Sequence, residues 1–345
     1  MFAKFDVYLA LPIFFLIAFG LFILDSLAPS LFPSYFVYVL IALIAFWFFS
    51  QIGFEVVSLF SKHLYVVSLG LLMLTLIIGQ VTRGSIRWIP IGNLTFQPAE
   101  IVRPLLLVFF AVFLTRGSLN LNQMFKGVGL LLVPVFLILI QPSLGVAILT
   151  VVGFFGILMA SDFNKKYIFG GVLVILALLP LFWQIMQPYQ RQRFLTFLNP
   201  ENDPLGAGYN SIQSTISVGA GKLFGRGLGK GVQTQLAFLP EKHTDFIFAS
   251  IAEELGFVGA SLLLIATFLI LHRLTFYMER ATSPAARAYL AGFFLTYFVQ
   301  VIIHIGMNLG LLPITGLPFP LVSAGGSSLL ATMMGLGIAV GAYKR

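Results

Sequence analysis

Long apolar runs without a charged side chain are the feature that most limits how this chain can fold. Val7–Leu24 and Leu64–Ile78 contain no Asp, Glu, Lys or Arg. A helix needs about 17–25 apolar residues to cross the hydrocarbon core of a bilayer. The runs are continuous rather than alternating, which favours helices over the strands of a membrane β-barrel. The sequence therefore predicts an all-α polytopic membrane protein.

Composition indicates the same class of protein. Of the 345 residues, 59% are hydrophobic and 9% are charged, whereas soluble domains average roughly 45–50% and 25%. A net charge of +8 would suggest nucleic-acid binding in a soluble protein. Here it is explained by basic loops between apolar helices, so we expect no nucleic-acid partner.

About ten stretches have the apolar character of a membrane helix, and we expect them to form a single domain over residues 1–345. Each continuous apolar run predicts one crossing. The fifth and sixth runs are separated only by Gln141–Gly145 and could instead form a helical hairpin. The expected spans are residues 6–25, 35–50, 64–81, 101–115, 127–141, 144–160, 167–186, 246–271, 287–308 and 324–343.

Basic residues on the loops predict the orientation of the spans. With the N-terminus inside, most lysines and arginines fall on cytoplasmic loops, whereas the short outer loops carry only Arg83 and Arg87. Short loops rich in Lys and Arg stay on the cytoplasmic side of a membrane. We therefore expect both termini in the cytoplasm.

The connection between the seventh and eighth expected spans, residues 187–244, is much longer than the others. Loops longer than about 12–15 residues are usually functional or disordered. Apolar residues such as Phe194, Phe197 and Ile212 favour packed structure here. Long loops cross membranes regardless of their charge, so we expect a structured extracytoplasmic loop.

Asp245 is the first candidate for chemistry because it lies where the eighth expected span begins, in PEKHTDFIFASIAEELGFVGA. It could simply cap the helix, since Asp complements the dipole at a helix N-terminus. It could also be a catalytic or ligand-binding acid, because an ionisable side chain in a membrane segment is a functional candidate. A divalent cation at Asp245 is possible although no metal-ligand spacing marks one, and no other cofactor is expected.

Glu253 and Glu254 lie deeper in the same expected span. Helix geometry puts Glu254 roughly 13 Å along the axis from Asp245 and on the opposite face, so these carboxylates do not form an acid–base pair. A bare carboxylate within the membrane costs a few kcal/mol, so Glu253 and Glu254 should face the interior and pair with a cation such as Arg103. His243 could tune Asp245 or carry a proton, or it could be structural.

A second cluster lies in the outer loop RGSIRWIPIGNLTFQPAEIVR. The guanidinium groups of Arg83, Arg87 and Arg103 suit phosphate oxygens. Glu100 stands three residues before Arg103 and could simply pair with it on one helix face. Gln97–Pro98 has the chemistry of a helix start.

A third cluster follows the ninth expected span. Pro313, Pro318 and Pro320 exclude regular helix there, and SAGGSS then opens the last span. Ser323, Ser327 and the backbone amides beside them could bind an anion at the helix N-terminus. Alternatively, the small residues could act only as a cap that lets helices pack closely.

The long loop adds two further cations, Arg193 and Lys230, as candidates for phosphate contact. The segment GAGKLFGRGLGKG is not a nucleotide phosphate loop, because Lys230 is followed by Gly rather than Ser or Thr and no strand precedes it. All the clusters combine few acids with many cations on an apolar scaffold. We therefore expect a substrate with a phosphate head and a lipid tail, bound at the outer leaflet.

Short blocks in a fixed order cover nearly the whole chain: RWI, QPAE, QPSLG, RFLTFLNP, GYNSIQS, GRGLG, LPEKHTDFIFASIAEELGF and PITGLPFPLVSAGGSS. This order resembles the shape, elongation, division and sporulation family, whose best-known members are RodA and FtsW. The short termini are more similar to those of RodA.

The resemblance implies a peptidoglycan glycosyltransferase of the bacterial cytoplasmic membrane that acts in cell elongation. Such enzymes polymerise lipid II at the outer face, release undecaprenyl pyrophosphate and work with a class B penicillin-binding protein. The essential acid of the family falls on Asp245. Arginines at positions 83, 87, 103 and 193 would then offset charge on the leaving pyrophosphate.

Three positions depart from the family pattern. Ser143 stands where the family usually has Asp, Arg103 replaces a usual Lys, and Ala99 replaces a usual Ser. The missing carboxylate at Ser143 puts any role of that family position in doubt here. Two other functions stay open: a flippase that moves the same lipid, with Glu253, Glu254 and Arg103 as its pathway, or a non-catalytic scaffold for cell-wall enzymes.

Overall fold

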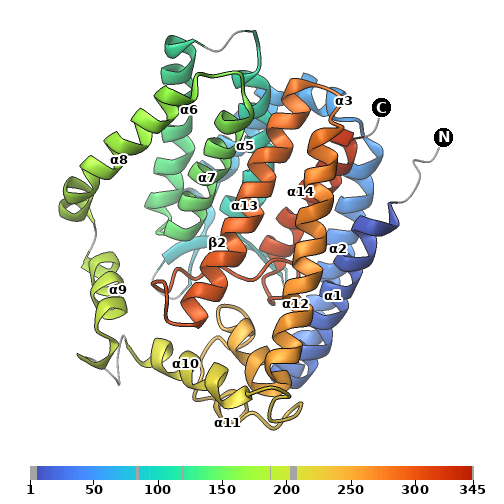
Figure 1. The fold of residues 1–345 in the computed structure, drawn as a ribbon, viewed down its shortest axis with the longest axis vertical. Coiled ribbons are helices and arrows are strands. Elements are labelled where there is room, and N and C mark those ends of the chain that lie inside the picture. The colour runs from blue at the N-terminus through green and yellow to red at the C-terminus, as the bar shows by residue number, and fades with distance from the viewer. Residues whose placement is uncertain are drawn as a thin grey trace.

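The computed structural model describes residues 6–82, 85–92, 94–117, 120–186, 188–202 and 208–343 (Figure 1). Each expected span overlaps one of its helices, which confirms the helical membrane fold. These helices are α1 (Val7–Leu27), α2 (Phe32–Gln51), α4 (Ser61–Ile78), α5 (Pro98–Leu114), α6 (Leu121–Ile140), α7 (Leu144–Ala160), α8 (Lys165–Ile185), α12 (Ile247–Glu279), α13 (Pro284–Asn308) and α14 (Gly326–Tyr343).

Length and composition distinguish these helices. Seven helices in the described part of the chain are long and apolar enough to cross a membrane, whereas α7 is apolar but has only 17 residues. The helix α5 also has 17 residues and contains Glu100 and Arg103 near its start. The count of ten spans therefore stays a prediction.

Shorter elements connect the long helices. Between α8 and α12, the expected loop contains helices, and it packs α10 against α12. Its extracytoplasmic location stays a prediction. The short helical elements are η1 (Pro29–Leu31), α3 (Phe54–Leu59), α9 (Pro188–Leu198), η2 (Pro200–Asn202), α10 (Tyr209–Gly221) and α11 (Val232–Gln235).

A small antiparallel sheet, which the sequence analysis did not foresee, occupies the connection between α4 and α5. Its strands β1 (Gln80–Thr82), β2 (Ser85–Ile91) and β3 (Leu94–Phe96) lie in the order β1-β2-β3. Ile91 pairs with Leu94 across a two-residue turn that includes Gly92 at φ +60°, a conformation that favours glycine. The sheet brings β3 against the start of α14.

The helix α14 lies at the centre of the bundle. It packs against α2, α5 and α13, and nearly all its side chains from Gly326 to Ala342 are buried. Its sequence is rich in Gly, Ala and Met, and small residues allow neighbouring helices to approach closely. This packing holds the first turn of α14 in place, and with it the end of the loop that precedes α14.

The helix α12 is interrupted at Gly256, where the backbone has φ +69° and ψ −161°. The expected single span is therefore two helical parts. The part from Phe257 to Glu279 is roughly 34 Å long at about 1.5 Å per residue, enough to cross a hydrocarbon core of about 30 Å. The short part, Ile247–Leu255, lies against α10 and α11.

The segment from Lys222 to Gly227 supplies hydrogen-bond partners to the backbone groups at this interruption. The amides of Arg226 and Gly227 donate to the carbonyl oxygens of Glu253 and Glu254, at 2.8 and 3.0 Å. Beyond the interruption, the amides of Phe257 and Val258 donate to the carbonyl oxygens of Lys222 and Leu223, at 2.9 and 3.2 Å. Buried backbone groups need such partners, so the glycine-rich segment replaces the hydrogen bonds that the helix loses.

The two chain ends and the α10–α11 region lie at opposite ends of α12 (Figure 1). At one end, Asp6 accepts hydrogen bonds from Arg273 Nε, at 2.8 Å, and from the hydroxyl of Tyr277. The ring of Tyr343 stacks on Tyr277 with centroids 4.6 Å apart. This arrangement is compatible with the expected cytoplasmic termini, whose orientation stays a prediction.

Candidate functional site

Asp245 lies in a turn just before the short part of α12. The helix begins at Ile247 and its N-cap residue is Phe246, so Asp245 is not the N-cap residue that one interpretation of the sequence expected. The residue is half-buried. Its own carbonyl oxygen accepts a hydrogen bond from Nδ2 of Asn308 at 3.0 Å.

Asn308 fixes the backbone on both sides of this turn. It is fully buried at the end of α13, and its Oδ1 accepts from the amide of Ala249 at 2.9 Å. One side chain therefore joins the end of α13 to Asp245 and to the first turn of α12. Such a bridge restricts where the carboxylate of Asp245 can lie.

The loop that precedes α14 contacts the same turn. Oγ of Ser323 donates to the carbonyl oxygen of Thr244 at 2.7 Å, and the amide of Ala324 donates to that of His243 at 2.9 Å. The hydroxyl of Tyr35 donates to the carbonyl oxygen of Ser323 at 2.8 Å. The backbone carbonyl oxygens of residues 243–245 thus accept hydrogen bonds from two separate parts of the chain.

Gly316 brings this loop close to the carboxylate. A Cβ atom on Gly316 would lie 3.5 Å from Oδ2 of Asp245, and the residue has φ +71°. That backbone conformation favours glycine. The surface next to the carboxylate is therefore backbone, which lets a ligand approach Asp245 without a side chain from position 316.

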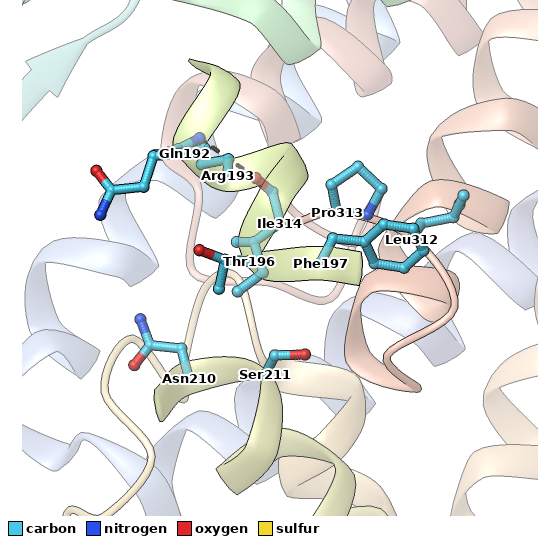
Figure 2. A pocket seen from close by; sticks show the side chains of 9 residues that line it. All are labelled: Gln192, Arg193, Thr196, Phe197, Asn210, Ser211, Leu312, Pro313 and Ile314. Atoms are coloured by element: carbon cyan, nitrogen blue, oxygen red, sulfur yellow. Dashed lines mark hydrogen bonds between the residues drawn. The ribbon is translucent and has the colours of Figure 1, made fainter. Parts of the chain in front are cut away.

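A cavity of about 320 Å³ lies along the same loop. It is enclosed by α9, α10 and residues 312–314, and Arg193 Nη1 donates to the carbonyl oxygen of Ile314 at 3.3 Å (Figure 2). Ile314 also packs against the small apolar cluster of Leu239, Phe246 and Ala249. The cavity wall is therefore continuous with the start of α12.

Glu253 and Glu254 are completely buried, as expected, but their partners are not the cations that the sequence suggested. Glu253 accepts from the amides of Gln233 and Thr234, at 2.9 and 3.0 Å, in the first turn of α11. Glu254 accepts from Nε2 of Gln235 at 2.7 Å and Oγ of Ser26 at 3.0 Å. Both carboxylates therefore stabilise the packing of α11 and α1 on α12.

The cation that interacts with Glu253 and Glu254 through its charge is Lys242 rather than the expected Arg103. Its Nζ donates to the carbonyl oxygen of Thr234 at 2.5 Å. Burial lowers the pKa of Lys242, and the charges of Glu254 and Glu253 partly offset that lowering. Lys242 thus ties the turn before Asp245 to α11.

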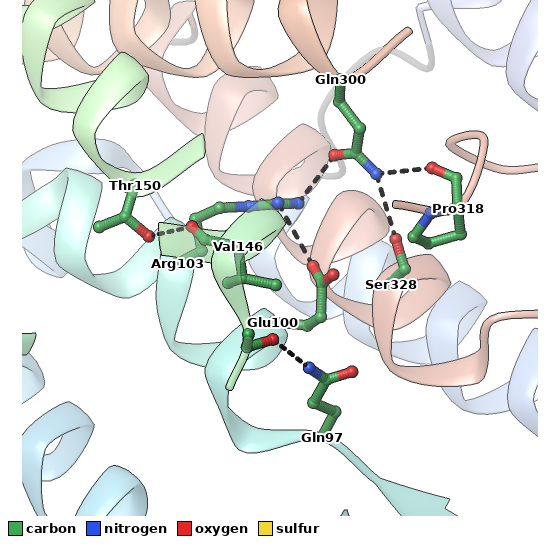
Figure 3. A network of polar contacts seen from close by, with 9 residues as sticks. Gln97, Glu100, Arg103, Val146, Thr150, Gln300, Pro318 and Ser328 are labelled. Atoms are coloured by element: carbon green, nitrogen blue, oxygen red, sulfur yellow. Dashed lines mark hydrogen bonds and ion pairs between the residues drawn. The ribbon is translucent and has the colours of Figure 1, made fainter. Parts of the chain in front are cut away.

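Arg103 lies inside the bundle, where it pairs with Glu100 and not with Glu253 or Glu254. Its Nη1 is 3.3 Å from Oε2 of Glu100, a distance of an ion pair without hydrogen-bond alignment. Its Nη2 donates to Oε1 of Gln300 at 3.1 Å, and Nε2 of Gln300 donates to the carbonyl oxygen of Pro318 at 2.9 Å (Figure 3). This network connects α5 and α13 to the loop before α14.

Ser143, where the family usually has Asp, is the N-cap residue of α7 and is buried. Its Oγ accepts from Nε2 of Gln97 at 2.9 Å. Gln97 is the N-cap residue of α5, as the sequence predicted. Its backbone amide donates to Oγ of Ser327 at 2.7 Å. The hydroxyl of Ser143 therefore joins two helix starts without a charge.

The other candidate residues have different surroundings. Arg83 lies outside the described residues, Arg87 is half-buried on β2, and Lys230 is exposed between α10 and α11. Ser323 and Ser327 are buried and hydrogen-bonded within the protein. Contact of these residues with phosphate stays a prediction.

The metal hypothesis has no further support from the geometry. Within the described residues, no group of three or more His, Asp or Glu side chains is placed to hold a metal ion. A divalent cation at Asp245 stays a prediction.

Sequence reasoning missed Asn308 and the residues that line the cavity. Asn308 ends an apolar helix in GMNLG and carries no charge, so only its burial and its two bridging hydrogen bonds reveal its role. Thr196 and Asn210 are separated by Pro, Gly and Asn-rich sequence, and only the fold brings their helices together around one cavity.

The fold and site define a polytopic helical membrane protein in which the turn of Asp245 is held by α13 and by a loop that also lines a cavity. The chain belongs to the cell cycle protein family of FtsW, RodA and SpoVE, whose model matches residues 3–344. This result confirms the family resemblance that the sequence motifs predicted.

Named relatives and solved structures agree with this assignment. The chain is 40% identical over 292 residues to peptidoglycan glycosyltransferase MrdB of Escherichia coli K12, covering 84% of this chain and 79% of that protein. It is 37% identical to a probable peptidoglycan glycosyltransferase FtsW of Coxiella burnetii, covering 89% of this chain and 84% of that protein.

Two structural matches cover nearly the whole chain. A chain from a study of polymerization and crosslinking by a peptidoglycan synthase complex matches with a TM-score of 0.86 and 31% identity, covering 98% of this chain and 97% of that one. The rod shape determining protein RodA of Thermus thermophilus matches with a TM-score of 0.75 and 27% identity, covering 100% and 99%.

Proposed function

We propose that this protein is a peptidoglycan glycosyltransferase that polymerises lipid II at the outer face of the bacterial cytoplasmic membrane during cell elongation. Undecaprenyl pyrophosphate leaves in each cycle. The activity named for its relatives supports this function. The observation that carries it is the placement of Asp245. Asn308 of α13 and Ser323 of the loop before α14 hold its turn, and that same loop also lines the cavity.

Asp245 is the catalytic base in this proposal. Its carboxylate accepts the proton of the acceptor sugar hydroxyl as that oxygen attacks the anomeric carbon of the donor. The bond from that carbon to the pyrophosphate breaks in the same displacement, which inverts the configuration. A base needs hydrogen-bond reach of the proton, and the glycine backbone at Gly316 leaves room for it.

In this proposal, cations offset the charge that grows on the pyrophosphate. Arg83, Arg87 and Lys230 are the candidates, and Arg193, whose Nη1 donates to the carbonyl oxygen of Ile314, is a further one. We assign Arg103 a structural role instead, because it is buried and paired with Glu100. Ser323 holds Thr244, next to the base.

A class B penicillin-binding protein is the proposed partner, and the match to a chain of a peptidoglycan synthase complex supports it. Both termini lie in the cytoplasm in this arrangement, and the segment of residues 187–244 lies outside. The opposite positions of the chain ends and α10 support that topology (Figure 1).

The test uses the purified full-length protein with its partner in detergent, supplied with lipid II. We expect glycan chains from the wild type and a loss of roughly 10²–10⁴-fold for Asp245→Asn, the usual contribution of a general base. Asp162→Asn makes the same chemical change at an exposed position between α7 and α8 and should keep wild-type activity. Polymerisation by Asp245→Asn at the wild-type rate would remove Asp245 from the mechanism.

The same assay separates the flippase alternative, because a flippase needs a sealed bilayer and makes no glycan in detergent. The structure gives the proposed flippase pathway little support. Glu253 and Glu254 bind α11 and α1, whereas Arg103 binds Glu100 and Gln300. A scaffold would show neither glycan synthesis nor a growth defect on Asp245→Asn.

A further inference from the structure

The cavity between α9 and α10 has two chemically different walls. Thr196, Asn210 and Ser211 contribute hydroxyl and amide groups, and Gln192 adds a second amide. Phe197 and residues 312–314 form an apolar wall on the other side (Figure 2). Among the described lining residues, the only charged one is Arg193.

We propose that this cavity is a subsite for an uncharged N-acetylated sugar ring of the peptidoglycan substrate. The inference rests on the proposed function and deepens it. Hydroxyl and carboxamide side chains both donate and accept hydrogen bonds, which matches the hydroxyl and acetamido groups of such a sugar. The flat face of Phe197 suits the C–H face of the ring, because aromatic faces carry partial negative charge.

Other parts of the substrate fit the cavity less well. A pyrophosphate would bring at least two negative charges to one guanidinium, Arg193, that already donates to the carbonyl oxygen of Ile314. Phosphate sites normally supply several charge-assisted donors. A prenyl chain would leave the polar groups of Thr196 and Asn210 without partners, at a cost of about 1–3 kcal/mol for each.

The position of the cavity relative to Asp245 supports the same occupant. Ile314 lines the cavity, and Gly316 stands beside Oδ2 of Asp245. Two residues of chain span at most about 7 Å, so a sugar in the cavity lies within one or two rings of the proposed base. The volume of about 320 Å³ falls at the lower end for small-molecule sites, which suits a single ring.

The sugar could come from the lipid-linked precursor or from the growing glycan strand, and the experiment distinguishes them. The double variant Thr196→Val with Asn210→Leu removes two polar groups at nearly constant volume. Thr215→Val is the matched control, since Thr215 is exposed, lies outside the cavity and donates to the carbonyl oxygen of Ser211 in its own helix. Thermal unfolding checks that each variant of the full-length protein is folded.

Three quantities are measured: KM and kcat for lipid II in detergent, and the affinity for a soluble, lipid-free glycan fragment built from N-acetylated disaccharides. Each lost hydrogen bond should weaken the affected affinity by about fivefold to tenfold, with kcat nearly constant. A raised KM alone places the precursor sugar in the cavity, whereas loss of fragment binding places the strand there. Both outcomes support the subsite.

The proposal is overturned if the folded double variant matches the Thr215→Val control in both KM and fragment affinity. It is also overturned if inorganic pyrophosphate binds the wild type and loses affinity in the double variant while the fragment does not. Failure of the proposed function looks different. In that case no glycan forms from lipid II, yet fragment binding still tests the cavity because it needs no turnover.

Discussion

The turn of residues 241–246 and the short helical part Ile247–Leu255 are neighbours that use acidic side chains in opposite ways. In the helical part, Glu253 and Glu254 are completely buried and accept hydrogen bonds from α11 and α1. In the turn, Asp245 is half-buried, and Asn308 and Ser323 donate hydrogen bonds to its carbonyl oxygen and to that of Thr244. The two buried glutamates therefore stabilise the fold, whereas Asp245, the proposed base, stays partly exposed.

The largest expected effect on stability comes from Glu253→Ala. The change leaves the amides of Gln233 and Thr234 without their acceptor, and each unsatisfied buried amide costs about 1–3 kcal/mol. The melting temperature should fall clearly, with activity lost only in proportion to unfolded protein. Glu279→Ala, at the exposed far end of α12, is the control. A stable but inactive Glu253→Ala would show instead that Glu253 takes part in catalysis, and the contrast with Asp245 would fail.

Gly256→Ala tests the interruption that lies between the two parts of α12. The residue has φ +69°, and an added Cβ would lie 2.3 Å from the amide nitrogen of Gly225. With ψ −161° the residue lies in a backbone region essentially confined to glycine, which costs another residue about 1–3 kcal/mol. The collision adds to this cost, so we expect about 2–4 kcal/mol of destabilisation by thermal unfolding. Gly219→Ala in α10 meets nothing within 4 Å and should be neutral or slightly stabilising. Equal melting temperatures of Gly256→Ala and Gly219→Ala would contradict the described conformation at Gly256.

Asn308→Ala tests whether the hydrogen bonds of Asn308 position Asp245 or only stabilise the fold. It removes the donor to Asp245 and the acceptor for Ala249, each worth about 1 kcal/mol. A group that positions the base should lower kcat by about tenfold and change KM little, because substrate binding is retained. Kinetics on folded protein, compared with its melting temperature, check this. A loss of stability with kcat per folded molecule unchanged would show that the bridge is only structural.

The smallest expected effect concerns Lys242 and pH. Because its pKa is lowered in the folded protein, the unfolded chain binds more protons between that lowered value and the ordinary value of 10.5. Folding stability should therefore rise slightly as pH increases through this alkaline window. Lys242→Met removes this contribution, so its melting temperature should lack the rise. An identical pH profile in both proteins would show that Lys242 does not contribute.

Much of this arrangement could be predicted from the chain. Uncharged runs such as Val7–Leu24 mark their helices because a bilayer demands length and apolarity, and Asp245 stands out as a carboxylate beside such a run. The partners of Glu253 and Glu254 could not be predicted. They are backbone amides and neutral side chains of α11 and α1, brought near only by tertiary packing.

The interruption of α12 was missed for a related reason. Glycine in EELGFVG is compatible with a continuous membrane helix, where Gly is common. The helix is nevertheless interrupted, because Lys222–Gly227, from elsewhere in the sequence, supplies substitute hydrogen bonds. The sheet β1–β3 escaped notice because a seven-residue strand is a weak signal beside long apolar helices.

The segment Lys222–Gly227 joins two helices and looks by position like a connection that could change length freely. Since four of its backbone groups bond residues 253–258 in register, one inserted residue would shift every later donor away from its acceptor. We therefore expect homologues to vary in length before or after this segment but not within it. A short stretch of connecting chain thus carries the sequence restraint normally found inside a transmembrane helix.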